Sequence, residues 1–210
     1  VVSLVSGFIL LVLGALLARP ILEAMSAPAD VIDLAKEYLT IYFCGMPFMM
    51  VYNFGSAVFR SVGDTKLPFY SLLVATLCNL VLDWVFVAVF DMGVAGVAWG
   101  TVISNGVNAA IIVFFLTREA EPVTLSITRW SVSVPDLKKM LQIGVPAGLQ
   151  GMVFSVSNIF IQSAINRFGA DAIAGSSAAL TYEAYCYYVV VAFCAATIAF
   201  AGQNYGAGLY

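Results

Sequence analysis

The 210-residue chain has no histidine, and only 10% of its residues are charged, against roughly 25% in soluble domains. Without histidine, the side chain that most often serves as a general base or binds transition metals is absent. The four cysteines form no CxxC pair, and all lie in apolar segments, which disfavours a disulfide or metal site: Cys44, Cys78, Cys186 and Cys194. HExxH, GxSxG and P-loop motifs are missing, as is a basic aromatic patch for nucleic acid.

Apolar sequence is what the chain has in abundance, since 62% of its residues are hydrophobic. Runs long enough to cross a hydrocarbon core of roughly 30 Å recur along its whole length. The fold class predicted is all-α, a polytopic membrane protein with six spans near residues 1–18, 38–59, 68–90, 94–116, 140–165 and 173–201. No basic segment precedes the first run, which is therefore interpreted as a span and not as a signal peptide.

One long polar connector, residues 118–139, interrupts the apolar pattern. It predicts a linker between an N-terminal part with four spans, residues 1–117, and a C-terminal part with two spans, residues 140–210. Of the nine Lys and Arg residues, six fall in the loops after the second and fourth spans and three in the opposite loops. Because cytoplasmic loops of membrane proteins are enriched in Lys and Arg, we expect those two loops on the cytoplasmic side of the cell (inner) membrane.

Asp83 lies inside the apolar run 73–90, and Asn79 precedes it by one helical turn on the same face. A charged carboxylate at the centre of a span costs about 2.5–3.5 kcal/mol on insertion scales. Neither Asp83 nor Glu183, the acid of the sixth span, has a Lys or Arg in its own span. The pattern predicts a proton or cation site at these acids, with Asn79 as a neutral oxygen ligand of the kind Na⁺ prefers. The alternative is a structural acid bonded to neighbouring amides.

Other spans also carry polar faces at helical spacing. Asn158 and Gln162 follow one edge of the fifth span, Asn53 lies on the polar face of the second, and Tyr187 shares a face with Glu183. Hydrogen bonding between helices explains a single face of this kind. Several such faces with two acids predict a wet internal cavity, with Glu183 enclosed and bonded to a Tyr or Ser. The opposite side of the fifth span is predicted to face lipid: Leu149, Val153 and Phe160.

Three functional classes fit a chain of this composition: a secondary transporter, an intramembrane aspartyl protease and a non-catalytic membrane scaffold. The protease needs two acids facing each other at a scissile bond, and no YD or GxGD motif occurs. A scaffold does not require polar faces on five spans. The residues therefore favour the transporter.

The motif FRSVGDTKLP at residues 59–68 resembles the cytoplasmic loop of the MATE (multidrug and toxic compound extrusion) transporters. CNLVLD, followed by DMGVAGVAWGTVIS, is similar to the fifth and sixth helices of that family. IGVPAGLQGMVFSVSNIFIQSAINRFG and the later AGSSAALTYEAY resemble the seventh and eighth helices of its bacterial multidrug-like branch. The resemblance covers nearly the whole chain and implies the third to the eighth of twelve helices arranged in two lobes.

The resemblance implies a Na⁺- or proton-driven antiporter that exports cationic or amphipathic small molecules by alternating access. It implies a monomer in the lipid bilayer, not an enzyme, with no cofactor besides the coupling ion and no nucleic-acid partner. The runner-up is a lipid-linked oligosaccharide flippase of the same superfamily, for which a strongly cationic cavity is expected. The spans here contain almost no Lys or Arg, which favours the antiporter.

Individual residues match the family's motifs. Asn79 and Asp83 match its fifth-helix polar pair, and Glu183 stands where the bacterial branch often has an acid. In the seventh helix, where another branch has an acid, this sequence offers Gln150 together with Asn158 and Gln162 as cavity residues. Four residues match the cytoplasmic loop motif: Arg60, Gly63, Asp64 and Pro68. Of these, Arg60 and Asp64 are expected to serve a helix cap and cytoplasmic gating contacts instead of binding.

Overall fold

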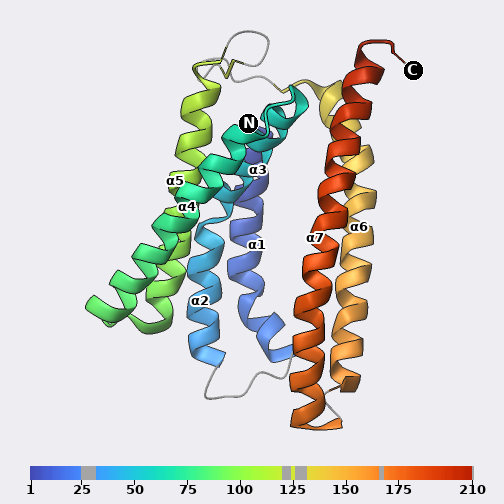
Figure 1. Ribbon diagram of the computed structural model, residues 1–210. Coiled ribbons are helices and arrows are strands. Elements are labelled where there is room, and N and C mark those ends of the chain that lie inside the picture. The colour runs from blue at the N-terminus through green and yellow to red at the C-terminus, as the bar shows by residue number, and fades with distance from the viewer. Residues whose placement is uncertain (25–31, 120–123, 126–131, 166–167, 210) are drawn as a thin grey trace. The chain divides into compact units, whose positions relative to one another are not determined.

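The computed structural model describes residues 1–24, 32–119, 124–125, 132–165 and 168–209, and every regular element in these ranges is a helix. Figure 1 shows their order along the chain. The elements are α1 (Val2–Ala24), α2 (Ile32–Cys44), α3 (Met46–Ser61), α4 (Lys66–Trp84), a π-helical turn η1 (Val85–Val89), α5 (Gly93–Leu116), α6 (Val134–Ile165) and α7 (Ala170–Gly206).

Five of the described helices are long and apolar enough to cross a membrane, and the pair α2 and α3 makes a sixth if it counts as one bent span. The prediction of six spans in an all-α membrane protein is thereby confirmed. The helices extend beyond the predicted spans at several ends: α6, for example, begins at Val134 instead of near residue 140.

The second predicted span is broken, which the apolar run did not indicate. α2 and α3 meet at a 45° bend, with Gly45 between them and Pro47 in the first turn of α3. Proline has no N–H to donate to the preceding turn, and the Gly45 N–H bonds only three residues back, to the Tyr42 carbonyl at 3.0 Å. Gly45 is buried, and a Cβ there would lie 3.3 Å from Cγ2 of Val102 on α5. The bend therefore fits closely against α5.

The chain forms two compact units, Val1–Ser131 and Val132–Tyr210. The first contains α1 to α5, and the second contains α6 and α7, which run side by side in opposite directions (Figure 1). Much of the predicted linker 118–139, namely residues 120–123 and 126–131, lies outside the described residues. The assignment of the units to two lobes stays a prediction.

The first unit is organised around α5, which packs against α2, α3 and α4, while α1 packs against α2 and α3. Phe59 on α3 joins Ile112 and Leu116 on α5 in a buried apolar cluster. Glycines allow the backbones to approach. A Cβ on Gly7 of α1 would lie 2.5 Å from Cα of Pro47, and one on Gly55 of α3 would lie 2.2 Å from Cγ2 of Ile112.

The turn from α3 to α4 carries the loop motif. Gly63 has a φ of 88°, in the left-handed region that favours glycine. Oδ1 of Asp64 accepts hydrogen bonds from the N–H groups of Lys66 at 2.9 Å and Leu67 at 3.2 Å, so this side chain caps the start of α4. Pro68 is buried in the first turn of α4, where a missing N–H costs nothing, and Arg60 is exposed.

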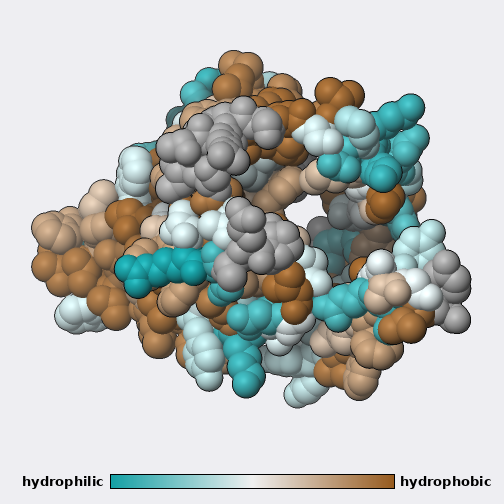
Figure 2. All heavy atoms as spheres, turned by 90° about the horizontal axis from the view of Figure 1, so that it is seen from above, coloured by the Kyte–Doolittle hydropathy of each residue, from teal (hydrophilic) through white to brown (hydrophobic). Residues whose placement is uncertain are grey.

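Within the first unit, the α3–α4 turn and the C-terminal end of α5 lie at the same end (Figure 1). Figure 2, which looks at the molecule from above, shows hydrophilic side chains in teal at this end, and hydrophobic ones in brown dominate the left flank. That arrangement suits a helical bundle in lipid. Which end faces the cytoplasm stays a prediction from the Lys and Arg distribution.

Candidate functional site

The candidate site is a polar pair on α4 that faces α5. Asn79 and Asp83 lie one turn apart, and the Nδ2 amide of Asn79 donates a hydrogen bond to Oδ1 of Asp83 at 3.2 Å. Both side chains are half-buried. The shared face predicted from the sequence is thus a direct contact, which fixes one carboxylate oxygen. The Asn79 carbonyl oxygen and the second carboxylate oxygen are the remaining acceptors of the pair.

On the other side of the pair lies the backbone of α5. A Cβ on Gly100 would be only 2.2 Å from Oδ1 of Asp83 and 3.5 Å from the Asp83 backbone nitrogen. One turn earlier on α5, a Cβ on Gly96 would lie 2.9 Å from Cβ of Phe86. Two glycines in successive turns therefore let α4 and η1 approach α5 closely, and the carboxylate lies directly against the α5 main chain. Sequence reasoning did not predict this contact.

The electrostatic surroundings of Asp83 include no basic residue from the two helices that form the site. α5 contains no Lys or Arg, and the only one in α4 is Lys66 at its first residue, more than four turns from Asp83. Among the described residues, no group of three or more His, Cys, Asp or Glu side chains comes together. The pair can therefore bind a proton or a single hard cation through oxygen atoms, and its charge is not consumed by an ion pair along either helix.

The helix changes its winding directly after Asp83. Residues Val85–Val89 form a π-helical turn, in which the N–H of Phe90 donates to the carbonyl of Val85, five residues back, at 3.1 Å. Asp91 then adopts a φ of 52°, and Gly93 a φ of 56°, as the chain reverses into α5. Single π-helical turns within α-helices occur frequently at functional sites. Here the π-helical turn adds one residue between Asp83 and the chain reversal at residues 91–93. It also places Phe86 against Gly96.

A second polar contact joins the same two helices away from Asp83. The Ser71 hydroxyl on α4 donates to Oδ1 of Asn108 on α5, and both side chains are buried. Sequence reasoning missed Ser71. The available signal was its position four residues before Ala75, on the side of α4 that carries small residues. This contact fixes the pairing of α4 with α5 and is closed to solvent.

The remaining predicted cavity residues are less enclosed. Asn53 on α3 is exposed. On α6, Asn158 and Gln150 are exposed and Gln162 is half-buried, and on α7 Tyr187 is exposed. Their assignment to a substrate cavity stays a prediction.

The enclosure predicted for Glu183 is not found in the second unit, because its side chain is exposed there. The three residues predicted to face lipid, Leu149, Val153 and Phe160, are exposed as well. The physical reason is that two neighbouring helices leave most of each side chain on the surface of the pair. Exposure in this unit therefore does not distinguish a cavity face from a lipid face.

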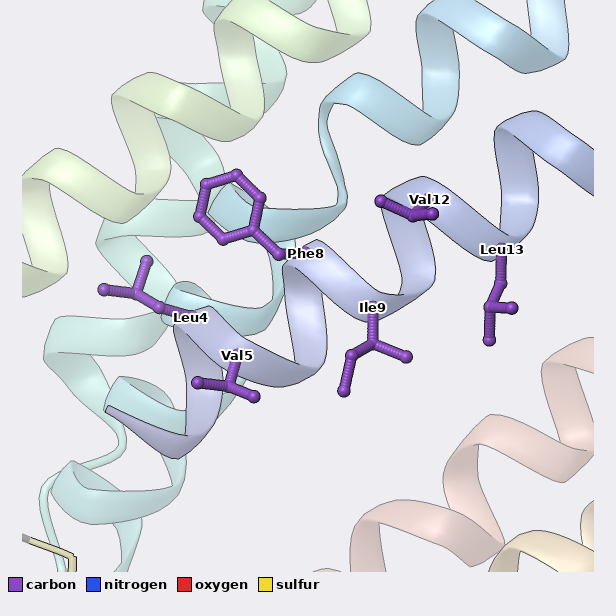
Figure 3. Close-up of a pocket in the computed structure, with 6 residues that line it drawn as sticks. All are labelled: Leu4, Val5, Phe8, Ile9, Val12 and Leu13. Carbon is purple, nitrogen blue, oxygen red and sulfur yellow. The ribbon is translucent and has the colours of Figure 1, made fainter.

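A surface depression over α1 is apolar throughout. Figure 3 shows its lining, and all six labelled side chains project from α1: Leu4, Val5, Phe8, Ile9, Val12 and Leu13. The lining offers neither a charge nor a hydrogen-bonding side chain to an ion. It has the character of a face that packs against lipid or another helix.

Comparison with known proteins shows similarity to one family of membrane proteins. The MatE family model matches residues 1–85. The probable multidrug resistance protein YpnP of Bacillus subtilis is 35% identical over 198 residues, which cover 93% of this chain and 43% of that protein. The probable multidrug resistance protein YoeA of the same organism is 31% identical over 208 residues, covering 96% of this chain and 45% of that protein.

The fold agrees with the sequence comparison. The crystal structure of a MATE protein in its bent conformation superimposes with a TM-score of 0.87 at 25% identity, covering 98% of this chain and 46% of that one. The chain thus spans less than half the length of the relatives it matches. The resemblance stated from the loop and helix motifs is confirmed along nearly the whole sequence. Over nearly its whole length the chain is similar to proteins of the MATE family, and it is a multi-pass cell-membrane protein.

Proposed function

We propose that this chain is part of a secondary active antiporter that exports cationic or amphipathic small molecules in exchange for Na⁺ or protons. The observation that carries the proposal is the Asn79–Asp83 pair, a carboxylate inside a membrane span with an amide as its hydrogen-bond donor. The relatives named as multidrug resistance proteins support the substrate class. Asp83, Asn79 and Glu183 are the proposed coupling residues.

The pair can couple ion and substrate movement through its charge. With no ion bound, the Asp83 carboxylate is negative, and holding that charge between helices is costly. A proton or Na⁺ on the second carboxylate oxygen removes the cost, and the side-chain carbonyl oxygen of Asn79 is the neutral ligand proposed for Na⁺. Since the two states differ by one unit of charge, ion occupancy favours one packing of the helices over the other. Such a difference in stability is what alternating access requires.

The test replaces the acid by its neutral isostere. In vesicles containing the complete protein, Asp83→Asn is expected to fold as well as the parent and to lose dye efflux driven by an imposed Na⁺ or pH gradient. Asn79→Ala removes one neutral ligand and is expected to weaken the ion dependence less. Asp91→Asn is the matched control, because it removes an acid from the nearby reversal, where asparagine tolerates the positive φ. Parent-like coupling in Asp83→Asn would show that this acid is structural.

A further inference from the structure

The space occupied by the Asp83 carboxylate exists because residue 100 has no side chain. Oδ1 of Asp83 lies 2.2 Å from the point where a Cβ on Gly100 would be, closer than any real Cβ contact. The same oxygen accepts the hydrogen bond from Asn79. Gly100 and Asn79 thus act on one oxygen atom from two different helices, and together they determine where the carboxylate points.

Gly100 differs from the other closely packed glycines of the first unit in what a methyl group would meet. At Gly7 it would meet the Pro47 backbone, and at Gly55 the fully buried Ile112. At Gly100 the atoms other than Oδ1 are at ordinary distances, 3.4 Å for Cγ and 3.5 Å for the backbone nitrogen of Asp83. A methyl at position 100 is therefore accommodated by turning one short side chain, with the helices left in place.

We infer that Gly100 is a positioning residue for ion coupling. By leaving room for Oδ1 against the α5 backbone, it keeps this oxygen on the Asn79 amide and directs the other carboxylate oxygen to the ion. The inference rests on the coupling role proposed for Asp83. It assigns to α5 a part in ion binding that requires no polar side chain from residue 100. A substitution there is expected to alter ion affinity while leaving ion-independent substrate binding intact.

The experiment compares Gly100→Ala with Gly106→Ala in the complete purified protein. Gly106 is the matched control, because it lies on the same helix and its added methyl would meet only Cδ2 of Phe48 at 4.0 Å. Na⁺ and pH are titrated separately, with tryptophan fluorescence as the readout, since Trp84 and Trp99 adjoin Asp83 and Gly100 in the sequence. Ethidium binding is measured by fluorescence anisotropy without Na⁺ and at fixed pH.

Gly100→Ala is expected to weaken the response to the coupling ion about tenfold, the effect of losing one hydrogen bond to a charged group, while ethidium binding is unchanged. Gly106→Ala is expected to behave like the parent in both titrations. Thermal melting of Gly100→Ala in an Asp83→Ala background separates positioning from packing. Without the carboxylate the added methyl meets no obstacle and should not lower the melting temperature further.

A parent-like ion response of Gly100→Ala would overturn the inference, and so would an equal loss of melting temperature with and without the Asp83 carboxylate. The Asp83→Asn variant identifies which proposal has failed. If Asp83→Asn abolishes the ion response and Gly100→Ala retains it, only the positioning role is wrong. If Asp83→Asn also responds like the parent, the coupling role of Asp83 is wrong, and the positioning role falls with it.

Discussion

The close approach of α3 to α5 at Gly55 provides a quantitative test of the packing. In Gly55→Ala, the new Cβ would lie 2.2 Å from Cγ2 of Ile112, whereas non-bonded carbon atoms prefer about 3.5–4.0 Å. Ile112 is completely buried in a cluster with Phe59 and Leu116, so it has no solvent into which to turn. The methyl group must therefore displace one helix or force Ile112 out of its rotamer.

Overpacking of a well-packed core costs about 1–3 kcal/mol. Replacing glycine by alanine within a helix contributes about 0.5–1 kcal/mol in the opposite direction. Gly106→Ala shares this gain without the clash, because its Cβ would have a single neighbour at 4.0 Å. Because the helix gain is common to both variants, we expect the free energy of unfolding of Gly55→Ala to be about 1–3 kcal/mol lower than that of Gly106→Ala.

The assay is equilibrium unfolding of the complete protein in mixed micelles, followed by tryptophan fluorescence. The double variant Gly55→Ala with Ile112→Ala adds a second measurement, because the new methyl fills part of the space that Ile112 leaves. The double variant should lose less stability than the sum of the two single changes, by about 0.5–3 kcal/mol. Equal stability of Gly55→Ala and Gly106→Ala, or strict additivity in the double variant, would refute the close packing described for α3 and α5.

Three further predictions concern the cap, the second acid and the topology. Asp64→Ala should lower stability by about 0.5–2 kcal/mol by removing the acceptor for the first N–H groups of α4, and Asp64→Asn should lose less, as measured by thermal melting. Glu183→Gln in the complete protein should reduce ethidium efflux, and undiminished efflux would assign Glu183 to packing. Single cysteines placed in the loops after α3 and α5 should react with a membrane-impermeant thiol reagent from the cytoplasmic side only; labelling of the two loops from opposite sides would contradict the topology.

Much of the fold could be predicted because lipid imposes simple rules on sequence. A span must be long, apolar and helical, so runs such as 94–116 correspond closely to α5. Helical phase also brought Asn79 and Asp83 to one face, since residues four apart in a helix are neighbours. Both predictions depend only on local geometry, which the sequence carries directly.

The missed features depend on contacts between helices or on departures from regular winding. The bend at Gly45 lies within an unbroken apolar run, so hydropathy gives no sign of it. The π-helical turn Val85–Val89 consists of ordinary apolar residues and is stabilised by its place beside α5. The approach of Asp83 to Gly100 joins residues of different helices, and a single sequence does not state which faces meet.

The break between α2 and α3 also constrains how the polypeptide is assembled in the bilayer. Pro47 cannot supply the N–H that the Phe43 carbonyl would accept in a continuous helix, and an unsatisfied backbone group in hydrocarbon costs several kcal/mol. In the folded unit α1 covers this region, with Gly7 against Pro47 and Gly14 against the ring of Phe43. Alone in lipid, the segment α2–α3 would expose the unpaired Phe43 carbonyl to hydrocarbon. The segment α2–α3 is thus expected to be a poor stop-transfer sequence by itself. It should leave the translocon paired with α1, and Gly7 and Gly14 of α1 are the residues that allow this pairing.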